Sequence, residues 1–283
     1  SASLSDRPSR TRDGIWRGIA QDIRGYQRED GTWALYDGAP GDLSTTIECY
    51  FALKLAGDAG AHLDRARDFI LSRGGIANAR VFTRIWLALC GGWRWDDLPA
   101  MPIELMLLPA TAPISIYRFS SWARATIVPL LVLMKERPVA PAPASASLAD
   151  LRAETAPSTP PPDLVARVFA GIDAVLRAYR KKPLRALQQR ATVEAERWIV
   201  EHQEADGSWG GIQPPWVYSL MSLHVLGYGA DDAVMREGLG GMHDKWLIRR
   251  ADGSMRVQAC LSPVWDTALA LVALTETPGR GRT

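Results

Sequence analysis

Two stretches of sequence with the same frame, Gln27-Arg-Glu-Asp-Gly-Thr-Trp33 and Gln203-Glu-Ala-Asp-Gly-Ser-Trp209, decide the fold. Each has Gln, two variable residues, Asp-Gly, a hydroxyl residue and Trp. A degenerate third copy, Arg249-Arg-Ala-Asp-Gly-Ser-Met255, carries Arg and Met in place of Gln and Trp. Because the matched positions recur at identical spacing, we interpret the three stretches as copies of one structural repeat.

The residues around each copy predict the structure of the repeat. Asp-Gly favours a tight turn, because Gly tolerates positive φ and Asp can hydrogen-bond to its own backbone. A helical pattern precedes the second copy at 191–202, and an apolar helical pattern follows it at 216–226. Strand signals are weak throughout. The sequence therefore predicts an all-α fold of helix–turn–helix units that pack side by side into a bundle or ring.

Composition narrows the class of protein. The 283 residues are 47% hydrophobic and 23% charged, which is typical of a globular protein with a sizeable core. The net charge of +2, with no basic stripe, argues against nucleic acid as a partner. Three separated cysteines suit a reducing compartment and not a disulfide framework, and the four scattered histidines predict no metal site. The residues concerned are Cys49, Cys90, Cys260, His62, His202, His224 and His243.

The chain is predicted to form one domain over residues 1–276. The segment 137–162 is rich in proline and is expected to be a long, solvated loop between two helical halves. The tail 277–283 is expected to be disordered. The longest apolar run, 127–134, is too short to span a bilayer. We therefore expect a cytoplasmic protein, with peripheral attachment to the inner face of the membrane left open.

Six blocks of the sequence closely resemble squalene–hopene cyclases, and the two Gln…Trp stretches look like that family's QW motifs. The blocks follow the family's order from about residue 27 to residue 275. They are Gln27-Arg-Glu-Asp-Gly-Thr-Trp-Ala-Leu-Tyr36, Asp42-Leu-Ser-Thr-Thr-Ile-Glu48, Arg80-Val-Phe-Thr-Arg-Ile-Trp-Leu-Ala-Leu89, Ser121-Trp-Ala-Arg-Ala-Thr126, Gly207-Ser-Trp-Gly-Gly-Ile-Gln-Pro-Pro-Trp216 and Ser262-Pro-Val-Trp-Asp-Thr267.

The resemblance implies a specific fold and reaction. The family has two α/α-barrel (toroid) domains, one inserted into the other, and this chain looks like the inserted one. The family's first helical segment would precede Ser1, and its second barrel would follow Thr283. The reaction implied is cofactor-free, cationic cyclisation of squalene or a related linear polyprenoid, started by an acid in an Asp-x-Asp-Asp motif on the second barrel.

That acid motif does not occur in these 283 residues. Two stretches, Asp42-Leu-Ser-Thr-Thr46 and Pro263-Val-Trp-Asp-Thr267, resemble it with Ser or Trp in place of the central proton donor. Neither Ser nor Trp can protonate an alkene, which is a poor base and needs a strengthened acid. The sequence therefore predicts a chain that helps to shape a cavity but cannot start the reaction alone, so no catalytic residue is assigned.

By resemblance, a set of mostly apolar side chains would line the substrate cavity. These are Phe82, Trp122, Ile212, Pro214, Tyr218 and Trp265. Such aromatic faces stabilise a cation by roughly 0.5–2 kcal/mol each. A second set would form a polar network at the far end of the cavity, where the cationic chain reaction is quenched. These are Glu48, Arg80, Trp86 and Gln213.

Plainer interpretations of the same residues stay open. Trp122 alone would more often be a core residue, and Asp266 could simply begin its helix. Glu48 and Arg80 could form a structural ion pair, and Gln213 could bond a loop backbone. The Trp33 and Trp209 side chains are interpreted as structural.

Three hypotheses for function follow. The chain could be part of a class II triterpene cyclase that needs a partner chain carrying the acid. It could instead be a non-catalytic lipid-binding or interaction domain, or another α-barrel enzyme. A prenyltransferase subunit would need a zinc site, and a glycoside hydrolase would need facing carboxylates, for which Asp42, Glu48 and Asp266 are available. An apolar face left without its second barrel predicts homodimerisation, adsorption to a membrane surface or aggregation.

Overall fold

The computed structural model describes residues 6–112, 114–151 and 164–276, which form an all-α protein with one small β-hairpin. The α-helices are α1 (Asp6–Gly25), α2 (Leu43–Leu55), α3 (Ala61–Ser72), α4 (Val81–Leu89), α5 (Ser121–Glu136), α6 (Leu164–Lys181), α7 (Arg185–Glu201), α8 (Gln213–Val225), α9 (Ala233–Gly241) and α10 (Pro263–Glu276). Shorter helical turns are η1 (Gly75–Asn78), η2 (Trp95–Asp97), η3 (Ile103–Leu107), η4 (Ile116–Arg118), η5 (Ala144–Ala146), η6 (Ala149–Leu151) and η7 (Met242–Trp246). The antiparallel hairpin consists of β1 (Leu247–Arg249) and β2 (Met255–Val257).

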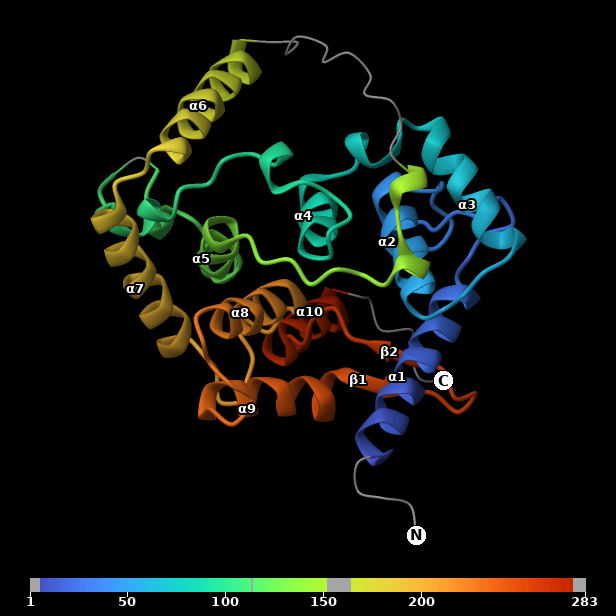
Figure 1. Ribbon diagram of the computed structural model, residues 1–283. Coiled ribbons are helices and arrows are strands. Elements are labelled where there is room, and N and C mark those ends of the chain that lie inside the picture. Colours follow the sequence, from blue (N-terminus) through green and yellow to red (C-terminus); the bar gives the residue numbers. More distant parts are fainter. Residues whose placement is uncertain (1–5, 113, 152–163, 277–283) are drawn as a thin grey trace.

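The helices form two layers, as an α/α barrel requires. The inner helices α2, α4, α5 and α8 are seen nearly end-on in Figure 1, and α1, α3, α7 and α9 lie around them. The inner helices run parallel. At the start of α4, the Arg80 N–H donates to Ser44 Oγ at the start of α2 (2.9 Å). A Cβ added to Gly210, just before α8, would lie 3.6 Å from the Ala125 Cβ near the start of α5, and further along both helices the Ser222 hydroxyl donates to the Pro129 carbonyl (2.8 Å). The Trp86 ring of α4 stacks on the Tyr218 ring of α8, each the sixth residue of its helix. These contacts align the starts of the four inner helices at the same end of the barrel.

Each half of the core is built around one tryptophan of the repeat. Trp33 belongs to a buried cluster formed mainly by α2 and α3, with Leu53 and Ile70 fully buried in it. Trp209 belongs to a second cluster between α5, α7 and α8. In that cluster, Trp216 packs edge-on against another fully buried indole at a ring distance of 4.8 Å. The expectation that Trp33 and Trp209 are buried structural residues agrees with these positions.

The first copy of the repeat joins two outer helices through its Gln and Trp side chains. Gln27 Nε2 donates to the carbonyl of Gly31 within the turn and to that of His62 in the first turn of α3, both at 2.9 Å. Trp33 Nε1 donates to the Ile23 carbonyl in the last turn of α1 at 2.7 Å. The end of α1 is thus fastened to the beginning of α3.

The second copy repeats this arrangement bond for bond. Gln203 Nε2 donates to the carbonyls of Gly207 (3.2 Å) and Val234 (2.8 Å), the latter in the first turn of α9. Trp209 Nε1 donates to the Ile199 carbonyl in the last turn of α7 at 2.7 Å. The sequence repeat is therefore also a structural repeat, which fastens α7 to α9 as the first copy fastens α1 to α3.

The third copy keeps the turn but not the helices. Its Asp-Gly turn closes the hairpin between β1 and β2, where the Ser254 N–H donates to Asp252 Oδ1 at 2.9 Å. Met255, in the place of the Trp, packs on α1 so closely that a Cβ added to Gly18 would lie 2.6 Å from its Cγ. Without the Gln amide and the indole N–H, the turn has no means of fastening two helix ends.

The proline-rich segment differs in part from its prediction. Residues 138–151 hold no α-helix, as expected, and only the single turns η5 and η6. They are not solvated throughout, however, because Ala146, Leu148 and Leu151 are buried against the α2–α3 half of the core. Apolar side chains between the prolines are sufficient to dock the segment. The remainder, 152–162, and the tail 277–283 lie outside the described residues.

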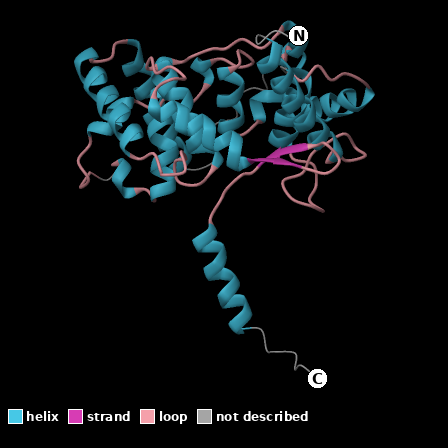
Figure 2. Cartoon of the chain, turned by 90° about the horizontal axis from the view of Figure 1, so that it is seen from below, coloured by secondary structure: helices cyan, strands magenta, loops and turns pink. Residues whose placement is uncertain are grey.

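Helix α10 lies outside the packed body, although the sequence predicted one domain through residue 276. Just before it, the Leu261 N–H donates to the Gly211 carbonyl (2.9 Å) and the Gln213 N–H to the Ala259 carbonyl (2.9 Å), which ties the chain to the start of α8. From there α10 projects away from the barrel, and every one of its residues is exposed (Figure 2). Among the described residues, none of the helices is both long and apolar enough to cross a membrane.

Substitution of the turn glycine in the second copy tests how tightly the repeat is packed. Gly207 has a φ of +86° and a Cβ there would lie 2.3 Å from the Glu237 carbonyl oxygen. Gly253, in the third copy, has a φ of +85° with no atom within 4 Å of such a Cβ. We expect Gly207→Ala to lower the free energy of unfolding by at least about 2 kcal/mol more than Gly253→Ala, because it adds a backbone clash to the same torsional strain. Urea titration of both variants measures the difference, and equal losses would contradict the prediction.

Candidate functional site

The candidate site lies at the end of the barrel where the inner helices begin. Because these helices are parallel, their first turns lie at one end. Aromatic side chains at this end are solvent-exposed: Phe82 at the start of α4 by 50% and Trp122 at the start of α5 by 60%. Tyr117 and Phe119, just before α5, are about half exposed as well. This end therefore presents aromatic faces to whatever occupies the space in front of it.

Asp42 and Arg80 fix the ends of α2 and α4 relative to each other. Asp42 is the N-cap of α2, where its Oδ1 accepts from the Thr45 N–H (2.8 Å) and hydroxyl (2.7 Å). Arg80 Nη2 donates to the same carboxyl oxygen at 2.8 Å. These hydrogen bonds outweigh burial and lower the pKa of Asp42 below its usual value. The structural ion pair between Arg80 and Glu48, one of the interpretations left open, does not form, because the guanidinium lies on the N-cap carboxylate of Asp42 instead.

Glu48 lies further along α2 and faces α4. Its carboxylate accepts a short hydrogen bond of 2.5 Å from the Thr83 hydroxyl. Solvent reaches the side chain, yet protein atoms surround most of it. This partial desolvation raises the pKa of Glu48, and the negative charge of Asp42 adds to the rise, whereas Thr83 and the charge of Arg80 oppose it. Glu48 is thus a weaker acid and a better proton acceptor than an ordinary glutamate.

Tyr218 and Trp86 continue the site across α4 to α8. The Trp86 ring stacks on the Tyr218 ring with centroids 5.1 Å apart and planes inclined by 27°. Tyr218 is almost fully buried, and its burial, together with the nearby charge of Glu48, raises the pKa of its hydroxyl. The phenol therefore stays neutral.

The remaining predicted residues fall into two groups. Ile212, Gln213 and Pro214 are half-buried at the start of α8, one turn before Tyr218. The Gln213 backbone N–H donates to the Ala259 carbonyl (2.9 Å), which leaves the role of the Gln213 amide a prediction. Trp265 is 67% exposed on the projecting α10 and is not brought to the other site residues. Asp266 lies in the first turn of that helix and accepts from the Ser262 hydroxyl at 2.9 Å. It therefore does not face Asp42 and Glu48 across a common cleft.

Two contacts within the site were not predicted from the sequence. The Thr83 hydroxyl holds Glu48, and Asp42, which the sequence offered only as a candidate carboxylate, holds Arg80. The sequence did contain a signal for Thr83. It lies three residues from each of the predicted site residues Arg80 and Trp86, a spacing that places all three on one face of a helix. In the described ranges, no group of three or more His, Cys, Asp or Glu side chains is placed to hold a metal ion. Burial and the charge of Glu48 raise the pKa of the Cys49 thiol to about 12, so it is not an activated nucleophile.

Comparison with known proteins assigns the family. The pattern of the squalene–hopene cyclase N-terminal domain matches residues 9–252. The chain belongs to the squalene–hopene cyclase family. It is 42% identical over 275 residues to a squalene–hopene cyclase of Alicyclobacillus acidocaldarius, covering 93% of this chain and 42% of that protein. The match to the domain ends before α10, which agrees with the position of that helix outside the barrel.

Relatives of the squalene–hopene cyclase family with other named products also match. A squalene hopane cyclase of Aspergillus fumigatus is 39% identical, with 89% of this chain and 36% of the relative covered. A dammaradiene synthase of Dryopteris crassirhizoma is 38% identical, with 90% of this chain and 38% of the relative covered. The chain spans about two fifths of the length of the curated relatives it matches.

The pKa of Glu48 provides a direct test of this site. We expect its titration, followed by carboxyl-selective NMR, to give a pKa above the usual value for glutamate, because the carboxylate is partly desolvated. Thr83→Val should raise it further, because the hydroxyl stabilises only the charged form. As a control, Thr192→Val removes a hydroxyl on α7 that bonds its own helix and should leave the Glu48 titration unchanged. A Glu48 pKa that falls in Thr83→Val would contradict this account.

Proposed function

We propose that this chain supplies part of the cavity of a squalene–hopene-cyclase-type enzyme and does not itself start the reaction. The observation that carries the proposal is the meeting of exposed aromatic side chains and the Glu48 carboxylate, held by the Thr83 hydroxyl, near the start of the parallel inner helices. Family membership supports squalene or a related linear polyprenoid as the substrate. Phe82 and Trp122 would then face the substrate, whose cationic intermediates need aromatic surfaces and little water.

Glu48 suits the end of such a reaction better than its beginning. Protonating an alkene requires a strong acid held in its protonated form, and desolvation makes Glu48 a weaker acid. A raised pKa makes the same carboxylate a better base for taking a proton from a carbocation. Thr83 would orient the carboxylate, and the neutral Tyr218 would add an aromatic face beside it. Arg80 and Gln213 would complete the polar surroundings that the family resemblance assigns.

The initiating acid would come from another folded unit, carried by a partner chain or by further sequence. Helix α10 supports such an association. It is apolar on every side, with Val264 84%, Leu269 52% and Leu274 73% exposed. A helix of this kind normally lies inside a protein core. We propose that α10 packs into the acid-bearing unit, which would also bring Trp265 to the common cavity. Dimerisation or adsorption to a membrane surface would cover the same face when that unit is absent.

Turnover of squalene tests the proposal. The purified chain is expected to form no cyclic triterpene, because it has no acid able to protonate the terminal alkene. Together with a polypeptide carrying the Asp-x-Asp-Asp barrel, it should form cyclic products that are detectable by gas chromatography and mass spectrometry. In that pair, Trp122→Ala should lower the yield at least about tenfold, since a lost cation–π contact of about 1–2 kcal/mol acts on each of several intermediates. Trp16→Ala, on the exposed surface of α1, is the matched control.

Two outcomes would count against this function. Cyclic product formed by the purified chain alone would mean that an acid within these residues starts the reaction. Tight squalene binding without turnover in the presence of an acid-bearing partner would favour the non-catalytic lipid-binding alternative. Analytical ultracentrifugation of the mixed chains should accompany the assay, so that a failure to associate is distinguished from a failure to react.

A further inference from the structure

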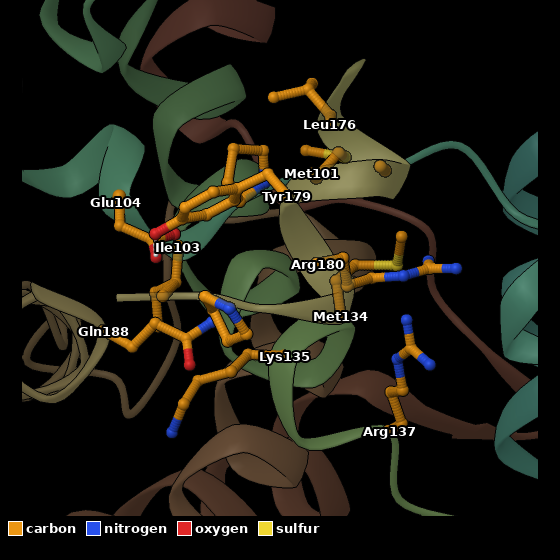
Figure 3. A pocket seen from close by; sticks show the side chains of 13 residues that line it. Met101, Ile103, Glu104, Met134, Lys135, Arg137, Leu176, Tyr179, Arg180 and Gln188 are labelled. Atoms are coloured by element: carbon orange, nitrogen blue, oxygen red, sulfur yellow. Dashed lines mark hydrogen bonds between the residues drawn. The ribbon is translucent and has the colours of Figure 1, made fainter. Parts of the chain in front are cut away.

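A second pocket lies at the other end of the barrel, under helix α6. It has a volume of about 320 Å³ and is enclosed by the end of α5, the segment before and within η3, and the second half of α6. Its apolar lining includes Met101, Met134 and Leu176, and Lys135 and Gln188 also border it, with the Lys135 ammonium paired to Glu136. Figure 3 shows charged side chains at its two ends, with Glu104 and Tyr179 at one and Arg137 and Arg180 at the other.

The acidic end holds an oxygen atom that lacks a partner. Glu104 Oε1 accepts from the Tyr179 hydroxyl at 2.6 Å, and that hydroxyl in turn accepts from the Leu184 N–H at 3.2 Å. The other carboxyl oxygen of Glu104, Oε2, is buried and has no hydrogen-bond partner within the described chain. A buried carboxylate oxygen without a donor is costly, because it has lost its water and gained nothing in return. This end therefore lacks a hydrogen-bond donor, preferably a charged one.

The basic end has the opposite deficit. Arg137 Nη1 and Arg180 Nη2 both donate to the same oxygen, Asp96 Oδ1, at 3.0 Å. The second amino group of Arg137, Nη2, is buried and unpartnered among the described residues. Arg180 is partly buried beside the charge of Arg137, and both effects lower its pKa. One carboxylate is shared by two guanidinium groups, so this end lacks an acceptor.

The backbone of Arg137 supports a role for its side chain. Arg137 ends α5 in the left-handed region, with a φ of 52°, and it is the one non-glycine residue with positive φ in the described ranges. Its N–H donates to the Leu133 carbonyl at 2.7 Å, which is the usual way in which a glycine or asparagine ends a helix. An arginine at such a position is strained, and the helix-ending backbone bond and the ion pair of its guanidinium with Asp96 both offset the strain.

We propose that this pocket binds a zwitterion, with its ammonium group on Glu104 and its anionic group on Arg137 and Arg180. A simple anion would satisfy Arg137 Nη2 but would leave Glu104 Oε2 without a donor. A simple cation would satisfy Glu104 Oε2 but would leave Arg137 Nη2 without an acceptor. A short aliphatic chain between the two charges fits the apolar lining at Met101 and Met134. Only a ligand with both charges meets both deficits.

This site is separate from the proposed cyclase cavity. Met134 follows Trp122 by twelve residues along α5, which corresponds to about 18 Å along the helix axis. The two sites lie at opposite ends of the inner helices. Binding at α6 therefore does not depend on the proposed function, and each proposal can fail without the other.

Ligands matched in chain length test the proposal. We would titrate the full chain with ω-amino acids of increasing chain length, each compared with the monocarboxylate and the monoamine of the same length. The methyl signals of Met101 and Met134 in 13C-labelled protein report binding at this pocket. At the optimal length, we expect the zwitterion to bind at least about tenfold more tightly than either singly charged ligand, because two charge-assisted hydrogen bonds form in place of one.

Two variants assign the ends of the ligand. Arg137→Asn should weaken the zwitterion to the level of the monoamine, and asparagine suits the left-handed backbone, so the fold should be retained. Glu104→Gln should weaken it to the level of the monocarboxylate, while the amide oxygen still accepts from Tyr179. Arg94→Gln changes the charge equally on a nearby, largely exposed arginine that does not line the pocket, and it should bind as the unchanged protein does. Thermal melting of each variant checks that it is folded.

Each remaining outcome overturns the proposal. A monocarboxylate that binds as tightly as the zwitterion would make this a plain anion site. A monoamine that does so would make it a plain cation site. Methyl signals that stay unmoved by every ligand at millimolar concentration would show that the two unpartnered atoms are structural.

Discussion

The barrel depends on buried hydrogen bonds that close the ends of its outer helices. The last carbonyls of a helix have no partner within it, and burying them unpaired costs about 1–3 kcal/mol each. Trp33 and Trp209 meet this need with an indole N–H placed at 2.7 Å from a carbonyl in the last turn of α1 and of α7. Because the same indoles fill the two core clusters, one side chain ends the helix and packs the interior. The Asp-Gly turn reverses the chain, so that the indole N–H reaches the carbonyl in the last turn of the helix before it.

The position of the candidate site follows from this connection. After an outer helix the chain turns back and enters the inner helix that follows it. Because the inner helices are entered in the same direction, they start at one end of the barrel. Their dipoles place partial positive charge there, which disfavours a cation. Asp42, as the N-cap carboxylate of α2, and the faces of Phe82 and Trp122 offset it. For the proposed cationic reaction, the end where the inner helices begin would therefore need the aromatic and acidic residues that it carries.

Local sequence was sufficient to predict the repeat, the all-α class and the burial of Trp33 and Trp209, because these depend on spacing and on one kind of hydrogen bond. Local sequence was insufficient where side chains from two distant segments could bind the same charged group. Arg80 has two carboxylates within reach, and the fixed N-cap position of Asp42 decides between them. The packing of Leu148 similarly depends on a gap beside α2 that no local pattern shows.

The placement of α10 shows a further limit of prediction from sequence. Its pattern matches that of the inner helices, and the repeat before it keeps the Asp-Gly turn. The copy has lost the Gln and Trp that fasten helix ends, and the hairpin that replaces them attaches to α1 through Asp22 and Arg256 at 3.0 Å. A repeat whose turn survives without its hydrogen-bonding side chains can therefore mark the edge of a barrel.

The proposed uptake of a proton would explain why a glutamate stands at position 48. Its pKa in the folded protein is raised, so protonation favours folding: the benefit is complete below the pKa of an unfolded glutamate and is lost as the pH rises through the folded value. At neutral pH the charged carboxylate therefore lowers stability. A glutamine would accept the hydrogen bond from Thr83 without this cost. A side chain that destabilises the fold only in its charged form, beside the neutral Tyr218 and the stacked Trp86, is suited to take up a proton.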